Sequence, residues 1–161
     1  MLSKKRSIPE LLHEWRYDEE LKQNIVHQTT LKGQPARYAV FPEKMHASIR
    51  KALQARGIEQ LYTHQRAAFD YATNGQSFTA VTPTASGKSY CYHLPVLQQI
   101  LEDPSSRAIY LFPTKALAQD QKSDLNELIE QMDEDILSYT YDGDTAPGIR
   151  QKIRKAGHIV M

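Results

Sequence analysis

The segment TAVTPTASGKSYCYHLPVL, residues 79–97, constrains the fold more than any other part of the chain. It joins a short apolar run, SFTAV, to a helix pattern through the loop TPTASGKS. A loop that binds phosphate needs backbone N–H groups at a helix N-terminus, a lysine for the phosphates and a hydroxyl for magnesium. Gly87, Lys88 and Ser89 stand at the spacing of that pattern. The segment therefore predicts a strand, a phosphate-binding loop and a helix in direct succession.

The loop departs from the strict phosphate-binding pattern at its first position, where Thr82 replaces glycine. Its middle, Pro83, Thr84, Ala85 and Ser86, also holds less glycine than the pattern usually carries. A structural turn between an ordinary strand and helix would fit the same residues. Taken alone, the loop leaves nucleotide binding and a simple turn both open.

Helix and strand patterns alternate along most of the chain. Apolar residues at helical spacing and end signals predict helices over 43–57, 63–75, 87–101, 115–132 and 146–156. Short apolar runs predict strands over 77–81, 108–112, 136–141 and 158–161. Strands separated by helices indicate an α/β fold with a parallel sheet flanked by helices. The last run reaches Met161 without a turn, so we expect a domain that is incomplete at the C-terminus.

The first 42 residues read as an N-terminal extension, and residues 43–161 as the domain itself. Ser7 and Glu10 predict a capped helix start, followed by apolar residues at helical spacing. Polar runs with Gly33, Pro35 and Pro42 then indicate an extended arm, with one short strand at 24–31.

Composition excludes several function classes. Twenty Lys+Arg against nineteen Asp+Glu give a formal charge of +1, so a role with nucleic acid has to rest on motifs. Cys91 is the only cysteine, which excludes an intrachain disulfide and a thiolate zinc cluster. His64 and His93 have no partner at metal-ligand spacing. No apolar run is long enough for a membrane helix, and we expect a cytoplasmic protein without a membrane partner.

Three further segments occur with the loop in a fixed order. LYTHQRAAF precedes it, and LFPTKALAQDQ and YDGDTAPGIR follow it. Together with the loop they resemble the motifs of superfamily-two helicases of the DEAD/DEAH-box kind. The YprA-like group of bacterial helicases, also called mitomycin repair factor A, is the most similar group. The resemblance spans roughly residues 43–161.

The resemblance implies a P-loop NTPase motor domain of the RecA-like type that binds ATP and magnesium. In such a domain Gln65 reads the adenine edge, Lys88 neutralises the phosphates, and Ser89 is the magnesium ligand. Lys88 and Ser89 are the implied catalytic residues. The implied nucleotide-binding residues are Gln65, Thr82, Pro83, Thr84, Ala85, Ser86, Gly87, Lys88 and Ser89.

The resemblance also implies contact with a nucleic-acid backbone. DNA is the implied partner, with RNA left open, and the implied process is DNA repair. The implied contact residues are Pro113, Thr114, Lys115, Gly143, Asp144, Thr145 and Arg150.

No Asp-Glu pair ends a later strand, and no second motor half is present. Phosphoryl transfer to water needs a carboxylate for the metal and usually an arginine finger. We therefore expect the first part of a helicase, with the remainder of the helicase chain as its partner. This part alone would not hydrolyse ATP efficiently, so the sequence leaves open whether the chain is an enzyme by itself.

Two alternatives remain from the residues. The loop also fits a P-loop kinase, although no acceptor-binding residues are recognisable. A non-catalytic fragment that binds nucleotide or nucleic acid is the other alternative, because Gln65, Pro113 and Asp142 each suit ordinary helix or turn positions as well.

Overall fold

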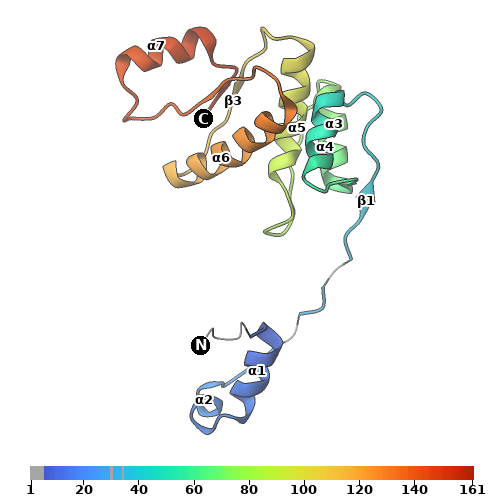
Figure 1. The fold of residues 1–161 in the computed structure, drawn as a ribbon, viewed down its shortest axis with the longest axis vertical. Helices are drawn as coiled ribbons and strands as arrows, with labels where there is room; N and C mark the ends of the chain where they lie inside the picture. The colour runs from blue at the N-terminus through green and yellow to red at the C-terminus, as the bar shows by residue number, and fades with distance from the viewer. Residues whose placement is uncertain (1–5, 30, 34) are drawn as a thin grey trace. The chain divides into compact units, whose positions relative to one another are not determined.

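The computed structural model describes residues 6–29, 31–33 and 35–161, which divide into two compact units, Met1–Pro35 and Ala36–Met161 (Figure 1). The second unit begins before the predicted boundary at residue 43. The reason is that strand β1 (Tyr38–Ala39) pairs with strand β2 (Leu61–Tyr62) of the second unit. This two-stranded antiparallel ribbon was not predicted from the sequence.

The first unit contains helices α1 (Ile8–Tyr17) and α2 (Glu19–Asn24). The predicted capping box is confirmed, since Ser7 N–H donates to the Glu10 carboxylate at 2.8 Å and Glu10 N–H donates to Ser7 Oγ at 3.4 Å. The predicted strand at 24–31 is wrong. Asn24 ends α2, and residues 25–29 and 31 form no strand. Val26 is 95% exposed, and no described strand pairs with this segment.

Helices α3 and α4 lie where the sequence places them in the second unit, although α3 begins at Ala47, later than residue 43. Gly57 and Gly75 adopt positive φ just after these two helices, as expected of glycines that end helices. The helix bounds are α3 Ala47–Ala55, α4 Thr63–Thr73, α5 Ser89–Glu102, α6 Lys115–Met132 and α7 Pro147–Ala156.

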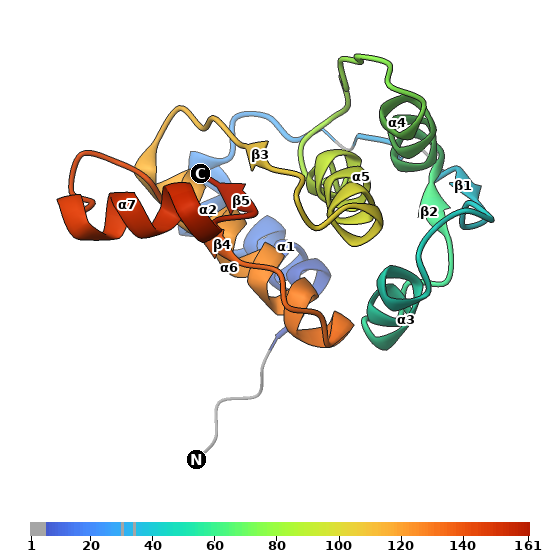
Figure 2. The ribbon, with the colours of Figure 1, turned by 90° about the horizontal axis from the view of Figure 1, so that it is seen from above.

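The core lies among helices α3 to α6, which Figure 2 shows grouped on one side of the sheet. Helix α5 packs against α4, and α3 packs against α6. Ile49, Phe69, Leu97 and Leu128 are fully buried in this core. Helix α5 is therefore held on several sides, which fixes the direction of its N-terminus.

The parallel sheet is confirmed. It contains β3 (Ala108–Ile109), β4 (Ser138–Tyr139) and β5 (Ile159–Val160) in the order β3-β5-β4, with both pairs parallel. Helix α6 connects β3 to β4 and helix α7 connects β4 to β5, as expected of βαβ units. The strands are shorter than predicted from the apolar runs.

The predicted strand at 77–81 is wrong. These residues form no strand, and Val81 is 87% exposed. A strand needs a neighbour to satisfy its backbone groups, and no described strand pairs with this run. The segment before α5 is therefore an irregular connection.

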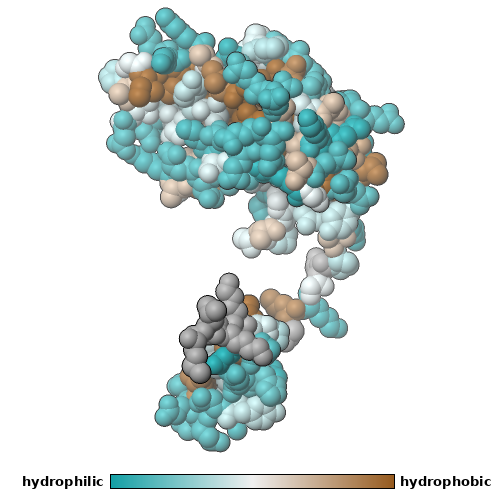
Figure 3. Space-filling view, in the orientation of Figure 1, coloured by the Kyte–Doolittle hydropathy of each residue, from teal (hydrophilic) through white to brown (hydrophobic). Residues whose placement is uncertain are grey.

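An apolar groove of about 410 Å³ lies beside β3, β5 and α7. Its lining includes Ile109, Leu111, Ile153 and Val160, and Leu111 is 89% exposed. Figure 3 shows apolar side chains gathered over this part of the unit. No described residue covers the groove.

Candidate functional site

The loop over residues 82–89 bends back on itself before α5. Ala85 has φ 57° and Gly87 has φ 70°, so both adopt the left-handed region. Gly87 reaches this region without steric cost, whereas an alanine there costs about 1–2 kcal/mol. A strained residue of this kind persists only where neighbouring contacts hold it.

Contacts inside the loop involve its first residue. The Thr82 and Ser86 hydroxyls lie 2.6 Å apart and share a hydrogen bond. The Lys88 ammonium donates to the carbonyl oxygens of Thr82 at 3.0 Å and Pro83 at 2.5 Å. Thr82, which departs from the glycine of the strict pattern, thus supplies a hydroxyl that closes the loop.

The backbone N–H groups of the loop are available to a ligand. Residues 84 and 85 form a turn, and no described residue accepts a hydrogen bond from the N–H groups of Thr84, Ala85, Gly87, Lys88 and Ser89. They stand at the N-terminus of α5, which begins at Ser89 and carries partial positive charge there. The N-terminus of α5 therefore combines backbone N–H donors with the Lys88 ammonium and the Ser89 hydroxyl. Groups of these kinds at a helix N-terminus bind phosphate.

Gln65 connects the segment before α4 to the loop. Its side-chain amide donates to the Gly87 carbonyl oxygen at 2.8 Å and accepts from the Tyr62 N–H at 2.9 Å. The side chain is only 3% exposed. A Cβ on Gly87 would lie 2.6 Å from Gln65 Nε2, so a side chain at position 87 would displace the Gln65 amide. His64 makes a second contact, 2.9 Å from Nε2 to the Ser86 carbonyl oxygen.

A cavity of about 440 Å³ opens beside Gln65 and Gly87. Its volume falls in the usual range for small-molecule pockets. Tyr38 stacks on Tyr62 with 5.2 Å between ring centroids, and both residues line the cavity. The complete lining is Tyr38, Gly57, Ile58, Glu59, Gln60, Tyr62, Gln65, Gly87 and Tyr90.

Arg56 supports the far wall of this cavity. Its guanidinium donates to the Tyr90 hydroxyl at 3.1 Å, to Asp124 Oδ1 at 3.3 Å and to Gln131 Oε1 at 2.8 Å. Asp124 and Gln131 belong to α6. The cavity wall is thereby joined to the helix that begins at Lys115.

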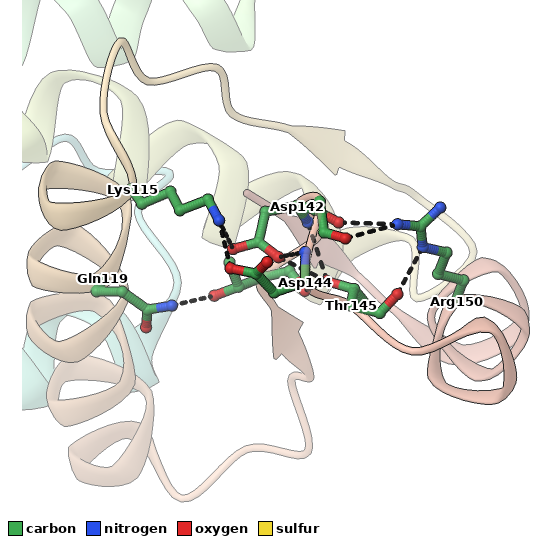
Figure 4. A network of polar contacts seen from close by, with 8 residues as sticks. Lys115, Gln119, Asp142, Asp144, Thr145 and Arg150 are labelled. Carbon is green, nitrogen blue, oxygen red and sulfur yellow. Dashed lines mark hydrogen bonds and ion pairs between the residues drawn. The ribbon is translucent and has the colours of Figure 1, made fainter.

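A second set of predicted residues comes together at the start of α6 (Figure 4). The Thr114 hydroxyl caps α6 by accepting from Leu117 N–H at 3.2 Å. Lys115 Nζ forms an ion pair with Asp144 and lies 4.0 Å from Asp142 Oδ2. The hydrogen bond to Asp144 raises the pKa of Lys115. Residues from separate segments thus meet at one exposed edge.

Arg150 holds the turn that contains residues 142–145. It donates to the carbonyl oxygens of Thr145 at 2.7 Å and Asp142 at 3.1 Å, and its Cζ lies 5.2 Å from the centre of the Tyr141 ring. The Thr145 hydroxyl accepts from Asp142 N–H at 2.9 Å. The guanidinium is therefore engaged within the protein, whereas Lys115 is exposed.

The structure brings the predicted residues together in two places. Gln65 meets the loop of residues 82–89, and Lys115 meets the turn of residues 142–145. Pro113 directly precedes the Thr114 cap, and Gly143 lies within the turn. Sequence reasoning missed His64 and Tyr62 as site residues, although His64 directly precedes Gln65 and Tyr62 stands three positions before it.

Ser89 is the residue predicted to bind magnesium, and it supplies one hydroxyl at the first position of α5. Within the described residues, no group of three or more His, Cys, Asp or Glu side chains could hold a metal ion. Magnesium commonly takes one or two protein ligands together with substrate phosphates, and Ser89 fits one of these positions.

The family model for DEAD/DEAH box helicases matches residues 62–161, which include the loop, Gln65 and the turn. The chain belongs to the DEAD/DEAH box helicase family. It is 54% identical over 158 residues to the uncharacterized ATP-dependent helicase YprA of Bacillus subtilis, covering 98% of this chain and 21% of that protein. It is 36% identical over 160 residues to the ATP-dependent helicase hrq1 of Schizosaccharomyces pombe, covering 96% of this chain and 15% of that protein.

Solved structures agree with this assignment. The crystal structure of the DUF1998 helicase MrfA bound to DNA and AMPPNP matches with TM-score 0.84 and 54% identity, covering 96% of this chain and 21% of that one. A DEAD box protein from Methanococcus jannaschii shares the fold, with TM-score 0.66 at 21% identity. The resemblance to the YprA-like group and the RecA-like helicase fold are thus confirmed.

The chain spans about a fifth of the length of YprA and MrfA. Among the described helices, none is long and apolar enough to cross a membrane.

Proposed function

We propose that this chain is the first part of the motor of an ATP-dependent DNA helicase, and that it binds ATP and a nucleic-acid backbone. The observation that carries the proposal is the contact between Gln65 and the Gly87 carbonyl. It joins a cavity of about 440 Å³ to the loop that precedes the N-terminus of α5.

The proposed nucleotide site has two halves. The cavity beside Tyr62 and Gln65 receives the base, and the loop N–H groups with Lys88 receive the phosphates. Lys88 exchanges its present acceptors, the carbonyl oxygens of Thr82 and Pro83, for phosphate oxygens. Ser89 holds the magnesium ion, which neutralises phosphate charge when it is bound. The crystal structure of MrfA with DNA and AMPPNP bound supports this proposal.

The proposed nucleic-acid contact lies at the start of α6 and the turn of residues 142–145. Helicase motors hold phosphates mainly through backbone N–H groups and a few side chains, which position the strand without reading its sequence. Lys115 supplies the exposed charge, and Arg150 keeps the turn in shape. The DNA in the MrfA structure favours DNA over RNA as the partner.

The activity of the whole protein is also part of the proposal. ATP hydrolysis and strand separation would need residues that these 161 positions do not supply. Relatives that are ATP-dependent helicases support this assignment, and we extend it to DNA repair in the cytoplasm.

Competition between ATP and GTP tests the nucleotide site. The unmodified chain should bind ATP more tightly than GTP, and Gln65→Ala should reduce that preference. Gln99→Ala, an exposed glutamine on α5, is the matched control and should keep it. Equal affinity of the unmodified chain for ATP and GTP would contradict the proposal.

A further inference from the structure

The imidazole of His64 contacts both the loop of residues 82–89 and Tyr62, a residue that lines the cavity. Its Nε2 is 2.9 Å from the Ser86 carbonyl oxygen. A carbonyl only accepts, so Nε2 carries the proton and donates it. The His64 ring also stacks on the Tyr62 ring, with 5.6 Å between the ring centroids and 11° between the ring planes.

The bond from His64 reaches the loop beside its strained residue. Ser86 follows Ala85, whose φ of 57° is left-handed although it is not glycine. Such a conformation needs contacts that hold it. Three contacts act at Ser86. The Thr82 hydroxyl and, at 3.5 Å, the Lys88 ammonium contact its hydroxyl, and His64 contacts its carbonyl oxygen. The Thr82 contact lies within the loop, whereas His64 anchors the loop to another segment.

Gln65 adds a second anchor one residue further, at the Gly87 carbonyl oxygen. Adjacent side chains thus hold adjacent carbonyls of the loop. When both carbonyl oxygens point toward residues 64–65, the N–H groups of the loop are left for a ligand.

We propose that His64 is a positioning residue of the nucleotide site. It holds the Ser86 carbonyl so that the loop keeps its phosphate-binding shape, and its own ring is held by stacking on Tyr62. The proposal rests on the proposed nucleotide-binding function. It assigns His64 a role toward the phosphates and leaves the base contacts to Tyr62 and Gln65.

Two variants separate the donor from the ring. His64→Phe keeps a ring to stack on Tyr62 and loses the donor. His64→Gln loses the ring and keeps an amide donor at a similar distance from the backbone. The affinities for ADP and for adenosine should be measured for both variants by competition against a fluorescent nucleotide. The same preparations should be digested with trypsin, with cleavage after Lys88 followed by mass spectrometry.

The expected result is selective. His64→Phe should weaken ADP binding about three- to tenfold, the effect of one lost hydrogen bond with some loosening of the loop. It should leave adenosine binding unchanged and speed cleavage after Lys88, because local opening admits the protease. Cleavage after Lys155, exposed on α7, is the internal control. His64→Gln should restore both ADP affinity and resistance to cleavage.

Equal losses of ADP and adenosine affinity in His64→Phe would overturn the proposal, and so would unchanged cleavage after Lys88. If the unmodified chain bound no ADP, the proposed function would fail. The cleavage comparison would still decide whether His64 holds the loop.

Discussion

The side-chain amide of Gln65 donates to the carbonyl oxygen of Gly87 at 2.8 Å, and a Cβ on Gly87 would lie 2.6 Å from the same nitrogen. Residues 65 and 87 are far apart in sequence, yet the Gln65 side chain occupies the space that a side chain at position 87 would need. Such a side chain would displace the Gln65 amide, and it would also be strained at the φ of 70°.

Gly87→Ala should therefore damage the nucleotide site. A side chain at this φ costs about 1–2 kcal/mol, and the contact with Gln65 has to be given up as well. We expect ADP affinity to fall at least about tenfold and the melting temperature to drop. Calorimetric titration and thermal unfolding would measure the two effects.

Gly148→Ala is the matched control for this change. No atom lies within 4 Å of a Cβ at Gly148, and the residue is in the first turn of α7. We expect unchanged ADP affinity and equal or higher stability, because alanine favours a helix over glycine. Similar losses in both variants would show that the Gln65 contact is not the cause.

Lys115 and Arg150 should affect DNA binding in different ways. Lys115 and its ion-pair partner Asp144 are both exposed, so Lys115 can exchange that partner for a phosphate, whereas Arg150 bonds to carbonyls that shape the turn. Lys115→Gln should lower the slope of log affinity against log salt by about 0.7 for a single strand. Arg150→Gln should weaken binding at every salt concentration without changing that slope.

Titration of a fluorescent single strand at several salt concentrations would distinguish these outcomes. A slope that falls equally in both variants would mean that Arg150 also contacts phosphate. In that case the turn would rearrange on binding, because the guanidinium would have to leave the carbonyl oxygens of Asp142 and Thr145.

His93 should make the stability of the domain depend on pH. Its imidazole is fully buried on α5, its Nε2 has no partner among the described residues, and burial together with Arg56 lowers its pKa from 6.5 to about 4. The unfolded chain thus binds the proton more readily than the folded one between these values. Stability should be complete above pH 6.5 and fall progressively until about pH 4, by roughly 3 kcal/mol from this residue.

Urea unfolding from pH 7.5 to pH 4 would measure this loss. His93→Leu replaces the imidazole with an apolar side chain that does not titrate, so its stability should depend less on pH across that interval. An identical pH dependence in the variant would show that His93 does not contribute.

The helices and the parallel sheet could be predicted from the sequence because their signals are local. The apolar residues Leu125, Leu128 and Met132 recur at helical spacing in α6, and all three are buried. The strand predicted at 77–81 is wrong because strand formation does not depend on local signals alone. A strand depends on a partner elsewhere, and hydrophobicity alone does not supply one.

The candidate site shows the same division. The loop and Gln65 are recognisable by their spacing, and their contact is present in the structure. His64 was passed over because no metal partner stands near it in sequence. Its partner is the backbone carbonyl oxygen of Ser86, and a contact with the backbone cannot be recognised from the residue types in a sequence. The contact of Arg150 with nucleic acid stays a prediction, and its hydrogen bonds to the carbonyl oxygens of Thr145 and Asp142 could not be predicted from the sequence.

Nucleotide binding by Lys88→Ala tests the central claim most directly. The chain should bind a fluorescent ADP analogue saturably, ATP should displace it, and Lys88→Ala should abolish binding while Lys155→Ala, an exposed lysine on α7, retains it. Saturable binding that survives Lys88→Ala, or no binding by the unmodified chain, would contradict the assignment of residues 82–89 as the phosphate site of a helicase motor.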